Sequence, residues 1–404
     1  MKQILPFVKH REPHKLVVVD KYHKFGFTTK CGNSIIDSQA GAYAFSLGYQ
    51  NQEILDHVRS SMGNVPYVRS NKYITAESIL RLQNKWSALS DNYLSHVFYG
   101  LGGSDALDTA IKMATEYWSA LGHDDKNQII TFKDSYHGST VAASYLCGMP
   151  VMNKQSPALK PNWIHYVDQP YHSEEESLRQ LEAKVIELDG KVSAIIKEPV
   201  TLLGGVIKCS DAYHQAIRDI CDKHNILLIV DDVATCGGKL GKFFGYQTMN
   251  VLPDIVTTAK SLTAGFAQLS ATFTNERVGL VLEQKPFMTG WTFTPPMPGI
   301  YAAEKVCEII QRDNLLKNVD DIEDWIKDSC TTLGDKIKTF RVVGTFAAIQ
   351  IRNDAEITRM KLFKKGLIIG STCIDNDQLL QMVLPINMQK QDVDTIFSVL
   401  NGVL

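Results

Sequence analysis

The stretch Ile226-Leu227-Leu228-Ile229-Val230-Asp231-Asp232-Val233 decides the fold. Its continuous apolar run is typical of a strand that is buried on both faces of a parallel sheet. The acids that follow directly would lie at the carboxyl edge of that sheet, where open α/β folds bind ligands. A buried carboxylate is costly without a cationic partner. We therefore expect Asp231 either to meet a cationic ligand atom, such as a protonated ring nitrogen, or to cap the next turn.

Short apolar runs alternate with helix-period stretches on both sides of this strand, which is typical of βαβ units. We expect strands at Ile226–Val230, His96–Tyr99, Gln128–Phe132, Val192–Ile196, Ile255–Thr258 and Leu269–Phe273, and helices at Asp105–Leu121, Glu174–Leu188 and Asp211–His224. Ser210 is placed to cap the last of these helices. The pattern predicts an α/β fold with a central, mostly parallel sheet flanked by helices.

The pattern changes after Pro298. A long helical stretch runs to Leu333, and a strand-like Arg341–Ile351 and a last helix from Gln391 follow. We expect a smaller α+β domain built from residues 1–50 and 299–404, beside a large ligand-binding domain of residues 51–298.

Composition excludes several classes of partner. The 404 residues carry 42 basic and 44 acidic side chains, so no general field favours nucleic acid or an anionic membrane surface, and neither is expected as a partner. No apolar run approaches the roughly 18 residues that span a bilayer, and residues 1–11 have no apolar signal-peptide segment. The eight cysteines are scattered without a C-x-x-C pair. We expect reduced thiols in the cytoplasm and no metal site.

Lys260 follows another short β-branched strand and has no charged neighbour between Ile255 and Gly265. A lysine in an apolar setting loses its proton more easily, and its neutral amine can form a Schiff base. Surface lysines are far commoner than catalytic ones, so this feature is weak by itself.

Three further motifs follow expected strands. Gly103 and Ser104 stand between a strand and a helix, where free backbone N–H groups cradle an anion. Tyr136 can stack on a flat heterocycle, and Gly138 allows close approach. Glu198 ends another strand. Each motif has an ordinary structural explanation, but together with Asp231 and Lys260 they form the set that pyridoxal phosphate (PLP) requires.

These residues resemble the class III aminotransferases of PLP fold type I. The residues that carry the likeness are Gly103-Ser104, Tyr136-His137-Gly138, Glu198-Pro199, Asp231-Asp232-Val233-Ala234-Thr235, Lys260 and Gly290-Trp291-Thr292-Phe293. The likeness runs from about Val19 to the C-terminus. Within the family the chain looks most similar to the adenosylmethionine-8-amino-7-oxononanoate aminotransferases of biotin biosynthesis, on the stretches 111–118, 232–235 and 269–272.

The resemblance implies a role for each residue. Lys260 would hold PLP as an aldimine and move the proton, and Asp231 would keep the pyridine nitrogen protonated. Gly103 and Ser104 would bind the phosphate, and Tyr136 would stack on the ring. The remaining residues implied to bind the cofactor are His137, Gly138, Glu198, Val233, Thr292 and Phe293.

Thr292 would reach the phosphate of a neighbouring subunit, which implies a homodimer with shared active sites. Phe7, Tyr43 and Tyr136 would face the substrate.

The substrate side departs from the pattern. That subgroup binds the substrate carboxylate through an arginine near the C-terminus, but the matching stretch 366–371 has a glycine there, and Lys361–Leu404 contains no arginine. Ala42-Tyr43 stand where a tryptophan pair is expected, Phe7 where a tyrosine is, and Ser139 where an acid is.

Two explanations are open for these departures. Another cation, such as Arg341, Arg352 or Lys364, binds the carboxylate, or the substrate lacks that group. We favour the second, because four pocket positions change together while the cofactor set is kept.

The sequence thus predicts an aminotransferase that moves an amino group from an amine or amino-acid donor to a ketone or aldehyde. Amination of 7-keto-8-aminopelargonate, or a related reaction, is one candidate. The alternatives are a PLP-dependent racemase or aminomutase of the same fold, and a non-catalytic relative.

Overall fold

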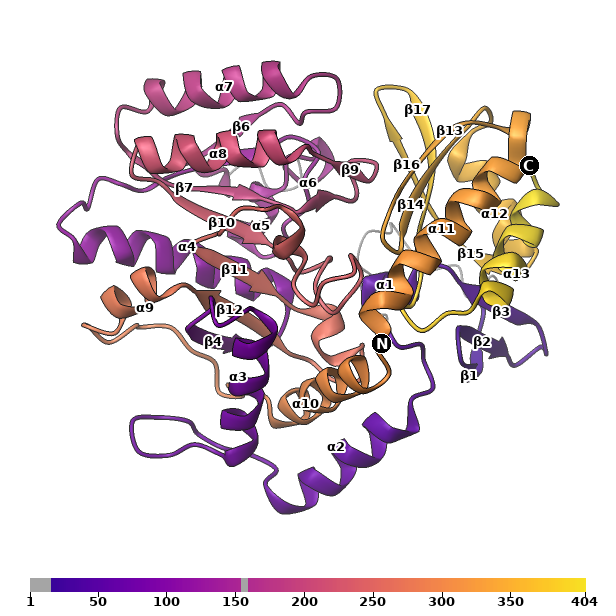
Figure 1. Cartoon of the computed structure of the whole chain (residues 1–404), viewed down its shortest axis with the longest axis horizontal. Coiled ribbons are helices and arrows are strands. Elements are labelled where there is room, and N and C mark those ends of the chain that lie inside the picture. The colour runs from indigo at the N-terminus through magenta and orange to yellow at the C-terminus, as the bar shows by residue number, and fades with distance from the viewer. Residues whose placement is uncertain (1–15, 154–158) are drawn as a thin grey trace.

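The computed structural model describes residues 16–153 and 159–404, so Phe7 lies outside the described residues. A larger body contains one sheet with helices on both faces, and a smaller lobe lies beside it (Figure 1). No helix in the described ranges is both long and apolar enough to cross a membrane.

A seven-stranded sheet forms the centre of the larger body, in the order β4-β12-β11-β10-β7-β5-β6. The strands are β4 (His96–Gly100), β5 (Gln128–Phe132), β6 (Ile164–Val167), β7 (Val192–Lys197), β10 (Leu227–Asp231), β11 (Ile255–Thr258) and β12 (Ser270–Thr274). Only the pairings of β12 are antiparallel. The predicted α/β fold with a mostly parallel sheet is confirmed, and the expected strands are present to within two residues at their ends.

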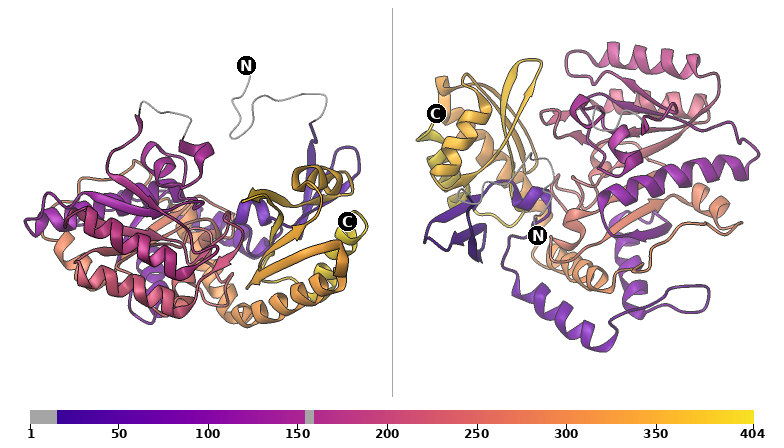
Figure 2. Two further views of the ribbon diagram at one scale, coloured as in Figure 1. Left: turned by 90° about the horizontal axis from the view of Figure 1, so that it is seen from above. Right: turned by 180° about the vertical axis from the view of Figure 1, so that it is seen from behind.

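Alternation along the strands divides the core into two layers. Ile229 pairs with Ile196 and Ile255, and these three side chains pack on one face of the sheet. Leu228 and Val230 pack on the other face. The first face is covered by α4 (Gly103–Ala120), α5 (Val141–Leu146) and α9 (Glu276–Leu282), and the second by α3 (Glu77–Leu89), α7 (Glu174–Glu187), α8 (Asp211–Lys223) and α10 (Met297–Arg312). Seen from behind, α4 crosses in front of the sheet (Figure 2).

Ser210 caps α8, as predicted. Its hydroxyl accepts a hydrogen bond from the backbone N–H of Tyr213 at 3.1 Å, which satisfies one of the free donors of the first turn. The cap fixes where the helix starts, and the strand β10 that carries Asp231 follows this helix along the chain.

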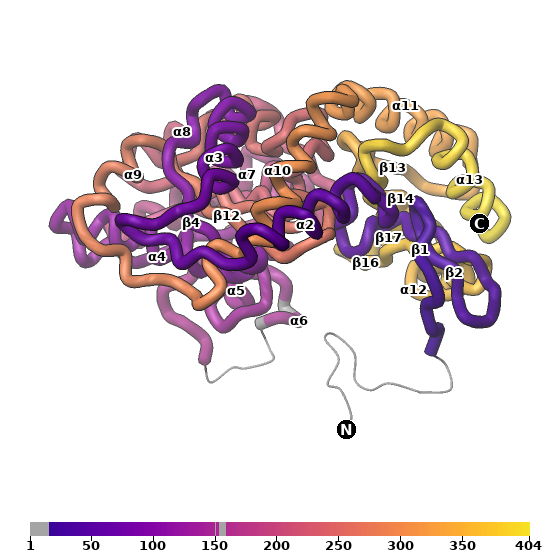
Figure 3. The backbone as a smooth tube through the Cα atoms, turned by 90° about the horizontal axis from the view of Figure 1, so that it is seen from below, coloured from indigo at the N-terminus to yellow at the C-terminus, as the bar shows by residue number. Residues whose placement is uncertain are grey.

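The smaller lobe is built from both ends of the described chain. Its antiparallel sheet has the order β13-β14-β17-β16 and consists of β13 (Ile337–Val343), β14 (Phe346–Ile351), β16 (Gly370–Ile374) and β17 (Asp377–Val383). The helices α11 (Leu315–Leu333), α12 (Ala355–Lys364) and α13 (Lys390–Asn401) belong to it. The N-terminal strands β1 (Val19–His23), β2 (Gly26–Thr29) and β3 (Ser34–Asp37) join it through β15 (Leu367–Ile368), which runs parallel to β3. Figure 3 shows β1 and β2 beside this lobe.

Two expected elements differ in the structure. The single helical stretch to Leu333 is wrong: α10 ends at Arg312, and α11 begins at Leu315 after Asn314 adopts a left-handed φ of 50°. The single strand Arg341–Ile351 is also wrong, because the chain reverses at Gly344, whose φ is 56°, and makes a hairpin of β13 and β14.

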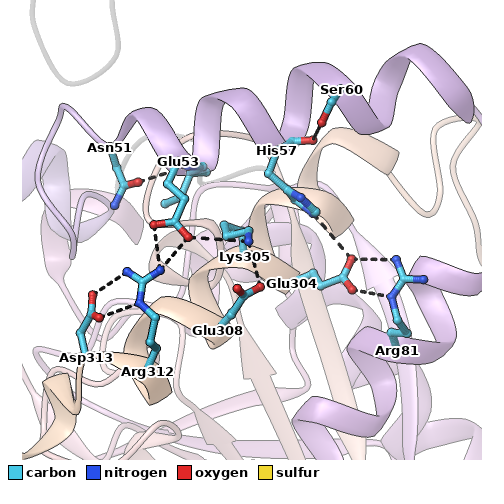
Figure 4. A network of polar contacts seen from close by, with 11 residues as sticks. Asn51, Glu53, His57, Ser60, Arg81, Glu304, Lys305, Glu308, Arg312 and Asp313 are labelled. Atoms are coloured by element: carbon cyan, nitrogen blue, oxygen red, sulfur yellow. Dashed lines mark hydrogen bonds and ion pairs between the residues drawn. The ribbon is translucent and has the colours of Figure 1, made fainter.

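Helix α10 is tied to the larger body by charged side chains (Figure 4). Arg81 of α3 lies 2.6 Å from Glu304, and Arg312 lies 2.8 Å from Glu53 of α2 (Gln52–Asn64). Apolar residues of α10, such as Ile300, also pack in the same core layer of the larger body as Leu228 and Val230. The division into domains stays a proposal, and this packing favours a boundary near residue 313 over one at 298.

Candidate active site

A cavity of about 430 Å³ opens where β5, β7, β10 and β11 reach their carboxyl ends and α4 begins. Ten of the residues predicted for the site line it: Tyr43, Gly103, Ser104, Tyr136, His137, Gly138, Glu198, Asp231, Val233 and Lys260. The structure therefore brings together side chains that are up to 217 positions apart (260 − 43).

Asp231 ends β10 with both carboxylate oxygens engaged. Oδ2 lies 2.7 Å from Nδ1 of His137, and both side chains are almost fully buried. Oδ1 accepts hydrogen bonds from the backbone N–H of Val233 at 3.1 Å and from the Thr257 hydroxyl at 3.2 Å. These partners fix the orientation of the carboxylate and offset the cost of its burial.

Lys260 follows β11 in a left-handed conformation with φ of 48°. Its Nζ lies 5.2 Å from the centre of the Tyr43 ring, within the range of a cation–π contact. Burial lowers the pKa of the Lys260 ammonium, and the nearby Asp231, Cys236 and Glu198 oppose that shift. A lysine prepared in this way loses its proton at lower cost, which a nucleophilic or proton-transferring amine requires.

The turn that carries Tyr43 is strained. Ala40, Gly41, Ala42 and Tyr43 have φ values of 45°, 58°, 59° and 72°, so three residues with side chains adopt the left-handed region. Such residues cost of order 1–3 kcal/mol each and persist only where their surroundings hold them. Asp37 accepts hydrogen bonds from the backbone N–H groups of Gln39 and Gly41 at 2.8 and 2.9 Å, and the Ser261 hydroxyl donates to the Tyr43 carbonyl at 3.0 Å. This strained turn places the aromatic ring of Tyr43 beside Lys260.

The opposite end of the cavity is shaped to hold an anion. Because α4 starts at Gly103, the N–H groups of its first turn have no partners within the helix, and the positive end of the helix dipole faces the cavity. Asp105 holds the preceding turn by accepting from Leu101 N at 2.8 Å and from Gly102 N at 3.1 Å.

Ser104 is held in the same region by the loop after β5. Its Oγ accepts a hydrogen bond from Ser139 N at 3.0 Å. Gly138 has φ of 132°, and a Cβ there would lie 2.6 Å from the same Oγ, so only glycine lets this loop approach the start of α4.

Glu198 lies at the end of β7 and is only 7% exposed. It accepts a hydrogen bond from the backbone N–H of Tyr136, but its Oε2 has no partner among the described residues. Burial raises the pKa of the Glu198 carboxyl to about 7, helped by Asp231 and opposed by His137 and Lys197.

Thr292 and Phe293 do not line this cavity. Both are exposed on the loop before α10, and the Tyr67 hydroxyl donates to the Thr292 carbonyl at 2.9 Å. The resemblance assigns Thr292 to the phosphate of a neighbouring subunit, and its position away from its own cavity is compatible with that assignment.

The three cations considered for a substrate carboxylate lie elsewhere, and none is among the described residues that line the cavity. The Nε of Arg341 donates to the Gly205 carbonyl at 2.7 Å, and its guanidinium lies over the Tyr171 ring. Arg352 donates to the Asp335 carbonyl, and Lys364 lines a separate hollow beside the N-terminal strands.

Gly370 marks the position where the resemblance places an arginine. A Cβ at Gly370 would lie 2.3 Å from Nε2 of Gln39. The amide of Gln39 therefore fills the space that a larger side chain at position 370 would need.

Five wall residues were not predicted from the sequence, namely Met149, Val151, Met152, Leu202 and Leu203. Ala42, which stands where a tryptophan is expected, and Ala234 of the family motif line the cavity as well. Leu202 and Leu203 follow the short strand β8 (Val200–Thr201), and Gln381 of β17 holds that loop by donating to the Leu202 carbonyl at 2.8 Å. Such loop residues carry no periodic pattern, so only the tertiary structure identifies them.

Comparison with known proteins gives a consistent result. The family model described as aminotransferase class-III matches residues 7–404. A putrescine–pyruvate aminotransferase of Pseudomonas aeruginosa is 29% identical, over 85% of this chain and 78% of that protein. An adenosylmethionine-8-amino-7-oxononanoate aminotransferase of Anoxybacillus flavithermus is 28% identical, over 87% of this chain and 81% of that protein.

A solved structure shares the whole fold. A transaminase from the marine bacterium Virgibacillus superposes with a TM-score of 0.94 at 24% identity, and the match covers 99% of this chain and 96% of that one. The two sequence relatives are named for different substrates at nearly equal identity, so the comparisons single out no substrate.

Proposed function

The chain belongs to the class III aminotransferases and is a PLP-dependent transaminase, and from this premise we propose the roles of its residues and its substrates. The donor is an amine or amino acid, and the acceptor is a ketone or aldehyde. Lys260 and Asp231 line one cavity, and this observation carries the proposal.

The residues present fit the cofactor. The first turn of α4 offers free N–H groups for a phosphate, with Ser104 beside them, and Asp231 supplies a buried, oriented carboxylate for the ring nitrogen. When bound, PLP supplies an electron-withdrawing ring.

The protein's own groups then act at stated atoms. With PLP bound, Nζ of Lys260 would hold the cofactor and later carry the proton of the transfer. The carboxylate of Asp231 would keep the proton on the ring nitrogen, with His137 fixing the orientation of the carboxylate. Tyr136 would stack on the ring and exclude water.

We propose that the enzyme works as a homodimer, with Thr292 completing the site of the neighbouring subunit. Exposed apolar side chains support this proposal: Tyr73, Met288 and Phe293 are 85%, 84% and 64% exposed, and side chains of this kind favour a protein–protein interface. We also propose a cytoplasmic location, on the ground that the cysteines are free thiols.

The reaction is tested on purified protein loaded with PLP, with a panel of primary amines and pyruvate as acceptor. We expect amine consumed and alanine formed in equal amounts. Lys260→Ala should lower the rate by at least about 10³-fold, since the proton-transferring group is lost. The exposed Lys285 offers a matched control, and Lys285→Ala should keep full activity.

Two outcomes would contradict the proposal. Amine conversion without stoichiometric amino transfer to pyruvate would favour a racemase or aminomutase. Unchanged turnover in Lys260→Ala would remove the assigned role of this residue.

A further inference from the structure

The charged side chains of the cavity wall indicate which charge the substrate can carry. This inference rests on the proposed function. The charged side chains among the described lining residues are Lys260, Asp231 and Glu198. Lys260 would be engaged by the cofactor, and Asp231 already has three hydrogen-bond partners. Glu198 is the remaining charged group of the wall.

The cations near Glu198 are engaged with other partners. Lys197 is the next residue along the chain, but its Nζ donates to Gln169 at 3.1 Å and to Thr201 at 3.2 Å. His137 faces Asp231 at 2.7 Å. Glu198 therefore lies in the wall with one backbone donor and with Oε2 unpartnered.

The described wall offers no counter-charge to a second anion. Arg341, Arg352 and Lys364 do not line the cavity, although Nη2 of Arg341 has no hydrogen-bond partner among the described residues. Gln39 fills the space above Gly370. The remaining wall is mostly apolar, from Met149, Val151, Met152, Leu202 and Leu203.

We propose that Glu198 is a specificity-determining residue. It favours a substrate with an ammonium or another hydrogen-bond donor at its non-reacting end, and it rejects one with a carboxylate there. A second carboxylate in this cavity would place two like charges in an apolar surrounding, which is costly. A cationic or neutral donor group avoids this repulsion and can pair with the Glu198 carboxyl, and the apolar wall suits the alkyl chain between the two ends of the substrate.

The preference should depend on pH. Burial raises the pKa of Glu198 to about 7, so the carboxyl ionises within the ordinary assay range. The titratable groups that face it are Asp231, His137, Lys197, Tyr43, Cys147 and Lys260. Selectivity for a cationic over a neutral substrate should rise as the pH passes through about 7.

Three amines of equal length test the charge preference in the holoenzyme: butylamine, 1,4-diaminobutane and 4-aminobutanoate. In the wild type we expect kcat/KM for 4-aminobutanoate to be at least about ten-fold below that for butylamine, and 1,4-diaminobutane to match or exceed butylamine. In Glu198→Gln, kcat/KM for 4-aminobutanoate should rise about ten-fold relative to that for butylamine. The variant should also lose any preference for 1,4-diaminobutane over butylamine.

Asp232→Asn is the matched control. Asp232 is a buried acid beside Asp231, but its oxygens are satisfied by Thr235 and by Gly245 N, and it does not line the cavity. Removing its charge should leave the order of the three amines unchanged.

A second measurement needs no turnover. Calorimetry with butanoate and N,N-dimethylbutylamine, neither of which can donate an amino group, should show tighter binding of the amine to wild-type holoenzyme and a smaller difference in Glu198→Gln. Equal binding of the two probes to the wild type, or an unchanged difference in the variant, would overturn the inference. Failure of all three reactive amines would instead count against the proposed function.

Discussion

Two buried acids share the cavity, and their surroundings give them different properties. Asp231 accepts hydrogen bonds from three donors, whereas Glu198 has one backbone donor and a pKa raised by burial to about 7. Two carboxyls with such different surroundings can do different work, Asp231 as a group held in one orientation and Glu198 as a group that ionises near neutral pH.

The raised pKa of Glu198 predicts a pH-dependent change in stability. Between its ordinary value of 4.5 and about 7 the unfolded chain has lost this proton while the folded chain keeps it, so Glu198 lowers stability as the pH rises. Glu198→Gln has no such group. In cofactor-free protein, the Tm of Glu198→Gln minus that of the wild type should increase by about 2–4 °C from pH 4.5 to 7.5.

A control separates this effect from the general response to pH. Glu116 is exposed, and Glu116→Gln should show a constant difference from the wild type. His214, whose pKa burial lowers to about 3, acts in the opposite direction but is present in all three proteins. A constant difference for Glu198→Gln would show that Glu198 does not titrate in this range.

The residues that were predictable are those at strand ends. Asp231 and Lys260 follow short apolar strands, and the carboxyl ends of parallel strands meet at one edge, so their convergence follows from the pattern. The His137 and Thr257 contacts of Asp231 were not predictable, because they depend on which strands are neighbours. Leu202 and Leu203 reach the cavity through a loop held by the other lobe, which no local pattern indicates.

At the scale of elements, the break between α10 and α11 shows where periodicity fails. The four polar residues 311–314 interrupt the apolar pattern, and the left-handed conformation of Asn314 turns the chain there. Asparagine adopts this conformation more readily than most residues. The orientation of β12 was not predictable either, because its sequence resembles that of the parallel strands of the sheet although it runs antiparallel to both of its neighbours, β4 and β11.

Two substitutions at Asn314 test this break. The residue is exposed, so packing does not complicate the result. Asn314→Val should lower stability by about 1–2 kcal/mol, because a β-branched residue resists a φ of 50°. Asn314→Gly should change it by less than about 0.5 kcal/mol. Thermal unfolding of the two variants checks the order, and equal losses would show that the asparagine side chain, not its conformation, matters.

At the scale of the whole molecule, the cavity depends on both lobes. The loop that carries Leu202 and Gly205 belongs to the larger body, yet Gln381 and Arg341 of the smaller lobe hold its carbonyl groups. The participation of the N-terminal residues in that lobe was expected from the pattern along the chain, but no strands were predicted there. Their pairing partner β15 was not predicted either, since two residues make no recognisable pattern.

The proposed sharing of sites between subunits predicts complementation. Lys260→Ala and Thr292→Asp should each be nearly inactive, the second because an added carboxylate repels the partner's bound phosphate. Coexpressed in equal amounts, they should recover about one quarter of wild-type activity, since half of the dimers are hybrids with one intact site. Light scattering should give twice the mass of the chain. No recovery in proven hybrid dimers would place Thr292 in its own subunit's site.

The order of the lining residues along the polypeptide also has a consequence for biosynthesis. The wall begins at Ala42 and is complete only at Lys260, and the loop that carries Leu202 is held by Gln381, close to the C-terminus. A nascent chain on the ribosome thus lacks the lysine until well over half of the protein has been made. The cofactor should therefore bind after translation, and chain fragments released early should not compete with the finished enzyme for the cell's supply of pyridoxal phosphate.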